Sequence, residues 1–496
     1  MKRLGEVGKE AFQAGILTVY GTEAQKVLRP QDGGEVLSWK LFRIRKSLEE
    51  MSDKLGFDFP WAASGPFNMR PYWTRVWIIQ EVTVPQQVNI LCGTMKVPFH
   101  HFAAATIFLG FHCVRTGIKS GISALIDPTE TAKLNQMALS SDSYGHLIGS
   151  RRRFQQMAGP EDDLLGLLKK TCLDNDFALD RRATDPRDII YGILGMATDV
   201  KTIGIKPDYR GSNTIQDVFT ETTRALLKRG RMIVLAWCRH PLKSPGLTDL
   251  PSWVPDFTSA ILSPCCEDKN YPLFLASGNG INTSRQAIFD SPKGPKFLAL
   301  NAQKVDTILM VSSPWHGEDF DFESCHHYLK TIVSYCEMAK SSPSKRGSPL
   351  SLINWAEALW RIPSADQAYD GARKRATPAL EKDYKELKFI IENVNSLQGL
   401  EALRNMSDSC NFYRLAIGYQ HARKVFMSND GYVGLVPATA TMWDVIVVVP
   451  GANMPFVLRK HLWQDTYTLI GEAYVHGIMD GEFVGQLPVQ ETFHVC

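Results

Sequence analysis

Residues 70–93 have the sequence RPYWTRVWIIQEVTVPQQVNILCG, and this stretch decides how the rest of the chain is interpreted. Residues 72–82 fit one short helix, and Pro71 suits its first position because proline lacks the N–H group that would be unpaired there. The helix is apolar nearly all round, which is typical of a buried helix. Apolar and polar residues then alternate over residues 87–92, a pattern that predicts a strand. A helix followed directly by a strand indicates an α/β region.

Two charged residues, Arg75 and Glu81, interrupt this apolar helix. Their spacing places them roughly 9 Å apart along a helix axis and about 120° apart around it. They are therefore poorly placed to pair with each other, and a buried charge is costly without a partner. We expect both side chains to be enclosed. Either both form structural ion pairs, or Glu81 lies at the edge of a ligand site.

The composition is that of an ordinary globular protein. The chain has 496 residues, of which 44% are hydrophobic, and a net charge of +3 from 55 basic and 52 acidic residues. This balance gives no general attraction to nucleic acid or to an anionic membrane. Residues 1–20 are not a signal peptide, and no apolar run reaches the roughly 18 residues of a membrane-spanning helix. The ten cysteines contain no CxxC pair, so we expect free thiols in a protein of the cytoplasm or nucleus, and we assign it to the cytoplasm.

The histidines and cysteines do not form a metal-binding pattern. His100, His101 and His112 lack the spacing of ligands on one helix face. Residues 325–327 (CHH) are adjacent on an expected helix, where neighbouring side chains point apart. Residues 278–280 (GNG) lack the third glycine of a dinucleotide-binding loop and predict a turn. We therefore expect no metal site and no bound cofactor.

A second informative segment is ATDPRDIIYGILGMA, residues 183–197. It predicts a helix for which Asp185 is the N-terminal cap. Arg187, Asp188 and Tyr191 could be catalytic. The interpretation that we favour is that they fix the end of this helix to its neighbours.

Several segments resemble the fungal heterokaryon-incompatibility (HET) family, and residues 70–93 resemble the end of the HET domain. The usual opening strand of that domain is not found, so we expect the chain to start partway through it. A truncated gene model, a degenerate copy and a true short form are all compatible with this. The matching residues are Trp73, Arg75, Val76, Trp77, Gln80 and Glu81, followed by TDPRD (184–188), PDY (207–209), LPSWVPDF (250–257), FVLR (456–459) and GEAYVHGIMDGE (471–482).

These observations predict an α+β protein. By resemblance its N-terminal part is an α/β remnant that is TIR-like, the middle is mostly helical, and a small antiparallel β unit lies at the C-terminus. The β unit is expected to combine strands from both sides of a helical insertion, since neither set alone covers its edges. The expected domains are a partial HET domain (1–115), a helical region with the TDPRD and LPSWVPD motifs (116–260), the β unit (261–317 plus 421–496) and the helical insertion (318–420). Strands are expected at residues 274–276, 297–300, 304–311, 425–426, 432–436, 444–449, 456–459 and 467–475.

The resemblance implies a role in fungal nonself recognition and programmed cell death, with other proteins of the incompatibility pathway as partners. HET domains are similar in fold to TIR domains, some of which cleave the nicotinamide–ribose bond of NAD with a glutamate on a helix. By that analogy Glu81 would stabilise the positive charge on the ribose, while Trp77 and Arg75 would bind the NAD. Because the opening half is absent, we favour a signalling protein without intact catalysis. The alternative is a TIR-like NAD glycohydrolase that uses Glu81.

Overall fold

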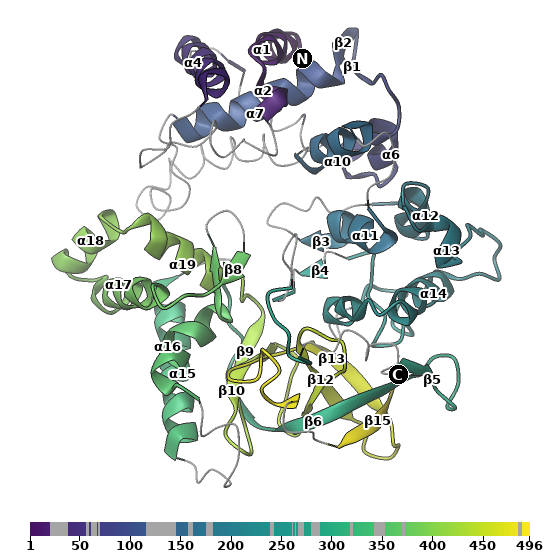
Figure 1. Ribbon diagram of the computed structural model, residues 1–496, viewed down its shortest axis with the longest axis vertical. Helices are drawn as coiled ribbons and strands as arrows, with labels where there is room; N and C mark the ends of the chain where they lie inside the picture. The colour runs from purple at the N-terminus through teal and green to yellow at the C-terminus, as the bar shows by residue number, and fades with distance from the viewer. Residues whose placement is uncertain are drawn as a thin grey trace. The chain divides into compact units, whose positions relative to one another are not determined.

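The structure is a computed structural model, and its elements are labelled in Figure 1. The chain divides into two compact units, unit 1 (Met1–Pro207) and unit 2 (Asp208–Cys496), which are described separately. The described residues are 1–19, 38–55, 59–60, 67, 70–115, 145–156, 162–174, 182–238, 243–259, 261–262, 264–265, 272–278, 288–317, 321–341, 353–369, 373–484 and 489–496.

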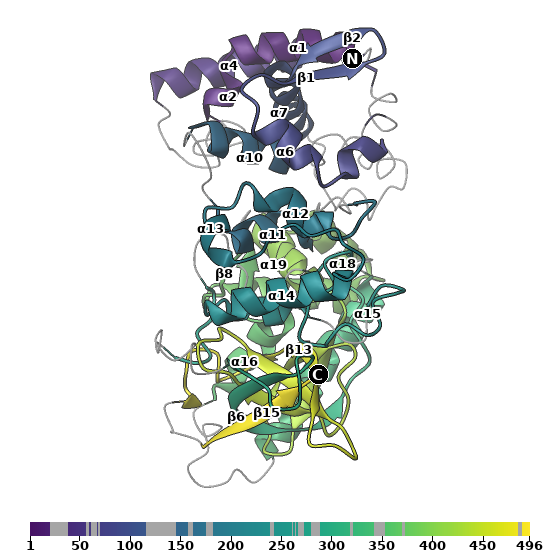
Figure 2. The ribbon, with the colours of Figure 1, turned by 90° about the vertical axis from the view of Figure 1, so that its right-hand side faces the viewer.

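Unit 1 begins with helices that pack on one long helix. Helices α1 (Lys2–Gln13), α2 (Ile16–Val19) and α4 (Trp39–Lys54) contact α7 (Phe99–Arg115), and Figures 1 and 2 both show α1 and α4 over the same side of α7. The approach of α1 to α7 is very close, because a Cβ added at Gly8 would lie 2.0 Å from the carbonyl oxygen of His101. Only glycine fits at such a crossing.

The single helix expected over residues 72–82 is wrong. The chain instead forms a 3-10 helix, η1 (Pro71–Thr74), and then a short α-helix, α6 (Ile78–Thr83). Between them the backbone leaves the helical path and pairs with Arg182: the Val76 N–H donates to the Arg182 carbonyl (3.0 Å), and the Arg182 N–H donates to the Thr74 carbonyl (2.7 Å). A distant segment therefore takes the hydrogen bonds that a continuous helix would have made.

The strand expected at residues 87–92 is present and is the first strand of a hairpin. Strands β1 (Asn89–Cys92) and β2 (Met95–Pro98) are antiparallel. Helix α10 (Gly145–Gln156) holds the end of α6, because the Arg151 guanidinium donates to the carbonyl oxygens of Val82, Pro85 and Gln86 at 2.6–2.7 Å. The basic run at residues 151–153 thus includes a side chain that donates to carbonyl groups at the end of α6 and just after it.

The rest of unit 1 consists of short elements: α11 (Leu164–Cys172), β3 (Leu173–Asp174), α12 (Asp188–Leu194) and α13 (Val200–Ile203). Unit 2 opens with α14 (Ile215–Lys228), which begins with a capping box between Thr214 and Asp217, and continues through the 3-10 helix η2 (Met232–Trp237) and β4 (Ile261–Leu262). Trp253 is fully buried and donates its indole N–H to the Lys296 carbonyl (3.0 Å).

Five strands of unit 2 form a closed ring. They are, in order, β6 (Leu298–Val311), β11 (Val445–Val448), β12 (Pro455–Lys460), β13 (Tyr467–Glu472) and β15 (Gln490–Val495), and β15 pairs with β6 again. The pairs are antiparallel except β13–β15, which meet in parallel at Tyr467 and Val495. Closing the ring leaves these strands without exposed edges.

The second half of β6 continues into further strands. Its residues from Ile308 to Val311 pair with β9 (Arg423–Ser428), which pairs with β10 (Val433–Pro437), which in turn pairs with β14 (Tyr474–Val475). The short strand β5 (Ile288–Asp290) pairs with the first residues of β6. The core between these strands is apolar and fully buried, and includes Ile308, Phe426, Val436, Ile446, Val448, Val457, Ile470 and Val475.

Helices lie between β6 and β9 in the sequence. They are α15 (Phe322–Ser341), α16 (Trp355–Arg361), α17 (Leu380–Asn393), α18 (Leu397–Arg404) and α19 (Asp408–Gly418), with the 3-10 helix η5 (Ile362–Ser364) and the hairpin β7 (Gln367–Tyr369)–β8 (Arg373–Arg375) among them. Figure 1 shows them beside the ring. Strands from both sides of this helical segment pair, as the sequence predicts.

The α+β class is therefore confirmed, with three differences in detail. Residues 274–276 are not a strand, and the two strands expected at 297–300 and 304–311 are one strand, β6. The ring also contains one parallel pair, so the sheet is not purely antiparallel. Residues 279–280 of the expected turn lie outside the described residues. No helix in the described part of the chain is long and apolar enough to cross a bilayer.

Candidate functional site

The two informative segments of unit 1 meet in the structure. The Trp77 indole N–H donates to the Asp188 carboxylate (3.0 Å), across 111 residues of sequence. Gly192 of α12 packs against Val76 and Trp77, since a Cβ at that position would lie 3.3 Å from Val76. The residues that resemble the HET family in these segments thus form one packed contact.

The helix at this contact begins later than the sequence predicts. Its N-terminal cap is Arg187, with no side-chain cap, and Asp185 is not the capping residue. Asp185 accepts the Arg187 N–H (3.0 Å) and pairs with its guanidinium (2.7 Å). This pairing lowers the pKa of Asp185. The Asp185 carboxylate is bound to Arg187 in a tight turn, and it therefore does not cap the first turn of α12.

The expectation that Arg75 and Glu81 are enclosed is wrong, because both side chains are exposed. Because the helix is broken between η1 and α6, residues 71–74 do not lie where a continuous helix would place them. In the structure the Tyr72 hydroxyl donates to the Glu81 carboxylate (3.0 Å). Partial burial of Tyr72 and this hydrogen bond raise the pKa of Tyr72 to about 12. Trp77 is half-buried, and its polar atom is directed to Asp188. The structure thus brings Trp77 together with Asp188, and Glu81 together with Tyr72.

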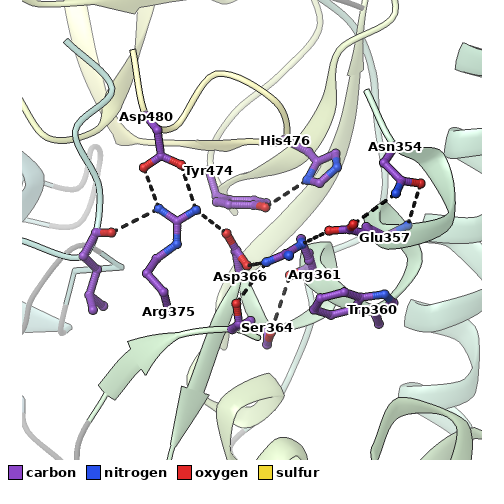
Figure 3. A network of polar contacts seen from close by, with 12 residues as sticks. Asn354, Glu357, Trp360, Arg361, Ser364, Asp366, Arg375, Tyr474, His476 and Asp480 are labelled. Carbon is purple, nitrogen blue, oxygen red and sulfur yellow. Dashed lines mark hydrogen bonds and ion pairs between the residues drawn. The ribbon is translucent and has the colours of Figure 1, made fainter. Parts of the chain in front are cut away.

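Unit 2 contains a network of charged and polar side chains around a buried carboxylate, shown in Figure 3. Asp366, whose side chain is 4% exposed, pairs with Arg361 (2.5 Å) and with Arg375 (2.6 Å). Arg361 also pairs with Glu357 (2.7 Å), and Arg375 with Asp480 (2.7 Å). We call this set of five residues the Asp366 network.

The backbone that carries Asp366 is a tight turn after η5. Ala365 and Asp366 have positive φ angles of 50° and 57°, a left-handed conformation that aspartate tolerates better than most residues. The Asp366 N–H donates to the Arg361 carbonyl (2.6 Å). The turn therefore directs the carboxylate to the guanidinium of the helix that it follows. Burial raises the pKa of Asp366, against the opposing effect of Arg375 and Arg361.

The other side of the network comes from residues 471–482, the C-terminal segment that resembles the family. Asp480 lies in it, and the Tyr474 hydroxyl is 3.1 Å from Nδ1 of His476 beside the network (Figure 3). Glu472 of the same segment is buried and pairs with Arg423, and its Oε1 also accepts the Cys265 N–H (2.7 Å). Residues 471–482 thus supply ionic partners to Arg375 and Arg423. Each charged side chain of the Asp366 network forms an ion pair with another member of that network.

Sequence reasoning missed this network. Residues 373–375 look like a short basic run of the solvated surface, yet Arg375 is the residue that joins Asp366 to Asp480. The one indication in the sequence was Asp480, an acidic residue within residues 471–482, which closely resemble the HET family. Its partner could not be identified because it lies 105 residues away. Among the described residues, no group of three or more His, Cys, Asp or Glu side chains could hold a metal ion.

We expect His476 to make the stability of unit 2 depend on pH. Burial, and then the charge of Arg361, lower the pKa of His476 from 6.5 to about 4. As the pH falls below 6.5 the unfolded chain binds a proton at this position and the folded protein does not, so the free energy of unfolding decreases by roughly 2–3 kcal/mol on the way to pH 4. Denaturant unfolding at a series of pH values measures this slope. The variant His476→Asn should have a shallower slope over the same pH range, and an unchanged slope would contradict the assignment.

Comparison with known proteins agrees with these observations. Residues 297–495, which include the closed ring, match the Het-6 beta-barrel domain. The chain is also similar to heterokaryon incompatibility protein 6, OR allele, of Neurospora crassa, with 24% identity over 456 residues, which is 83% of this chain and 64% of that protein. The chain thus spans less than two thirds of this relative's length, and no solved structure matches it. These findings agree with the resemblance to the fungal heterokaryon incompatibility (HET) family that the motifs indicate.

Proposed function

We propose that this protein acts in fungal nonself recognition, as a recognition and signalling protein without catalysis of its own. The observation that carries the proposal is the similarity to a heterokaryon incompatibility protein over 83% of the chain. Its partners would be other proteins of the incompatibility pathway, its location the cytoplasm, and its output programmed cell death.

The surroundings of Glu81 support a role without catalysis. A glycohydrolase carboxylate works best where water is excluded, because its charge then acts strongly on the charge that develops on the ribose. The Glu81 side chain is exposed and hydrogen-bonded to the Tyr72 hydroxyl. Trp77, which the NAD hypothesis assigns to ligand binding, donates its indole N–H to the Asp188 carboxylate. These contacts support a structural role for both residues.

The alternative remains a TIR-like NAD glycohydrolase in which Glu81 is catalytic and Trp77 and Arg75 bind NAD. It rests on the analogy between HET and TIR folds. In this reading the hydrogen bond from Tyr72 would orient the Glu81 carboxylate. The two proposals differ in one measurable quantity, the loss of NAD.

The first test follows NAD over time with the purified chain and with its Glu81→Gln variant. We expect the two to give the same rate as buffer. Faster loss with the unchanged chain than with Glu81→Gln would overturn the proposal and establish the alternative. Tyr72→Phe is the matched control, since it removes the hydrogen bond and leaves the carboxylate.

The second test addresses recognition in cells. The chain is expressed from an inducible promoter in a filamentous fungus, and the strain is confronted with a panel of genetically different strains. We expect growth arrest and uptake of a vital dye in fused cells for some pairings, equally with the unchanged chain and with Glu81→Gln. Normal growth in every pairing would contradict a role in recognition.

A further inference from the structure

We propose that the first half of α4 (Trp39–Lys54) is a docking surface for an anionic lipid membrane. This half of the helix presents two aromatic rings and a set of basic side chains on the face that is turned away from the protein. The proposal concerns peripheral binding at the membrane surface, and it is independent of the proposed function.

The helix has one face buried in unit 1. Leu41, Ile44 and Leu48 are 5%, 7% and 0% exposed, which fixes the rotation of the helix. On the opposite face Trp39 is 73% exposed and Phe42 is 47% exposed. Their rings are stacked, with centroids 5.8 Å apart and planes inclined by 18°. Large exposed aromatic side chains that lie side by side are typical of a binding surface.

The charges on α4 are segregated along its length. Residues 39–48 contain four basic residues and no acidic residue, and Lys40, Arg43 and Lys46 are exposed. At 100° per residue, Arg43 and Lys46 lie on the same helix face as the two rings. The acidic residues begin at Glu49, which pairs with Arg45 (3.0 Å). The first half of the helix is therefore a positively charged aromatic surface, and the second half is not.

This combination fits an anionic lipid surface. Tryptophan partitions to the boundary between head groups and acyl chains, and lysine and arginine beside it contact the anionic head groups. Figures 1 and 2 show α4 lying over α7, and the exposure of Trp39 and Phe42 places the aromatic face of α4 at the surface. A flat membrane can contact a helix in this position without a complementary groove.

Two other occupants fit less well. Single-stranded nucleic acid binds aromatic rings by stacking bases on their faces, and here the two rings already stack on each other. A second copy of the chain would meet this surface with the same surface in a symmetric dimer, which would bring Lys40, Arg43 and Lys46 close to their own counterparts. Both remain measurable outcomes of the test.

The test is co-sedimentation of the full chain with vesicles of phosphatidylcholine, with and without about one third phosphatidylserine. We expect binding to the anionic vesicles only, and weaker binding as the salt concentration rises. The double variant Trp39→Ser/Phe42→Ser should lower the affinity at least about tenfold. Arg43→Gln/Lys46→Gln should lower it about fivefold for each charge removed.

Matched controls come from other exposed residues of the chain. Trp463 is 93% exposed in unit 2, and Lys382 and Lys385 are exposed on α17. We expect Trp463→Ser and Lys382→Gln/Lys385→Gln to bind vesicles like the unchanged chain. All seven substituted aromatic and basic positions are at the surface, so thermal unfolding monitored by circular dichroism should be unchanged in each variant.

Several results would overturn the proposal. They are the absence of binding to anionic vesicles, equal binding to neutral vesicles, and loss of binding in Trp463→Ser with retention in Trp39→Ser/Phe42→Ser. A dimer in sedimentation velocity that Trp39→Ser/Phe42→Ser dissociates would assign the surface to a second copy. Binding of a single-stranded oligonucleotide that the same variant abolishes would assign it to nucleic acid.

Discussion

Replacing Arg423 with methionine is expected to lower the free energy of unfolding of unit 2 by about 3–5 kcal/mol. The side chains of Arg423 and Glu472 are 2% and 4% exposed, and they form an ion pair between β9 and β13. Without the guanidinium, the Glu472 carboxylate is left buried and without its cationic partner. Denaturant unfolding monitored by circular dichroism measures the loss.

The double variant Arg423→Met/Glu472→Gln separates the charge from the packing. Glutamine keeps the oxygen that accepts the Cys265 N–H and removes the charge. Because a neutral pair has no uncompensated charge, we expect the double variant to be more stable than Arg423→Met alone. If the two have equal stability, the loss in Arg423→Met arises from packing and the electrostatic account is wrong.

Replacing Asp366 with alanine is expected to have a similar effect, about 3–5 kcal/mol. Two partly buried guanidinium groups, those of Arg361 and Arg375, lose the buried carboxylate that they share. Alanine also tolerates the φ angle of 57° less well than aspartate, which adds a cost of about 1 kcal/mol. Asp366 lies in the turn between η5 and β7, so we expect the loss of stability to be accompanied by local opening of the β7–β8 hairpin, measurable by hydrogen exchange.

Two variants serve as controls for this prediction. Asp366→Asn keeps a side chain that tolerates the left-handed conformation and can accept a hydrogen bond, so its loss should be smaller than that of Asp366→Ala. Asp480→Asn changes the half-exposed end of the network, where side-chain exposure is 50%, and should cost less than about 1 kcal/mol. If Asp480→Asn lowered the free energy of unfolding as much as Asp366→Ala, the burial of the carboxylate would not determine the size of the loss.

Local patterns in the sequence predicted the elements that depend on neighbouring residues. The buried side of α4 follows from Leu41, Ile44 and Leu48 at helical spacing. Strand β1 follows from the alternation of apolar and polar residues over residues 87–92. The pairing of β6 with later strands was predicted because the edge strands of a small sheet expose unpaired backbone groups, which further strands cover.

The features that were missed depend on contacts between distant residues. The break after Thr74 exists because Arg182 supplies backbone hydrogen bonds there, and no periodicity within residues 72–82 records that partner. Asp366 could not be identified because its partners are a helix residue, Arg361, and a hairpin residue, Arg375. For Glu81, enclosure was inferred from an unbroken helix, so the error about the helix became an error about the site.

The order of the strands in the ring has a consequence for synthesis of the protein on the ribosome. Strand β6 is made early, and its partner β15 (Gln490–Val495) is made after all the other strands of the ring. Until β15 has left the exit tunnel, one side of β6 carries free backbone donors and acceptors, which are available to other chains. We therefore expect nascent chains stalled before residue 490 to bind chaperones and to aggregate more readily than chains that include β15.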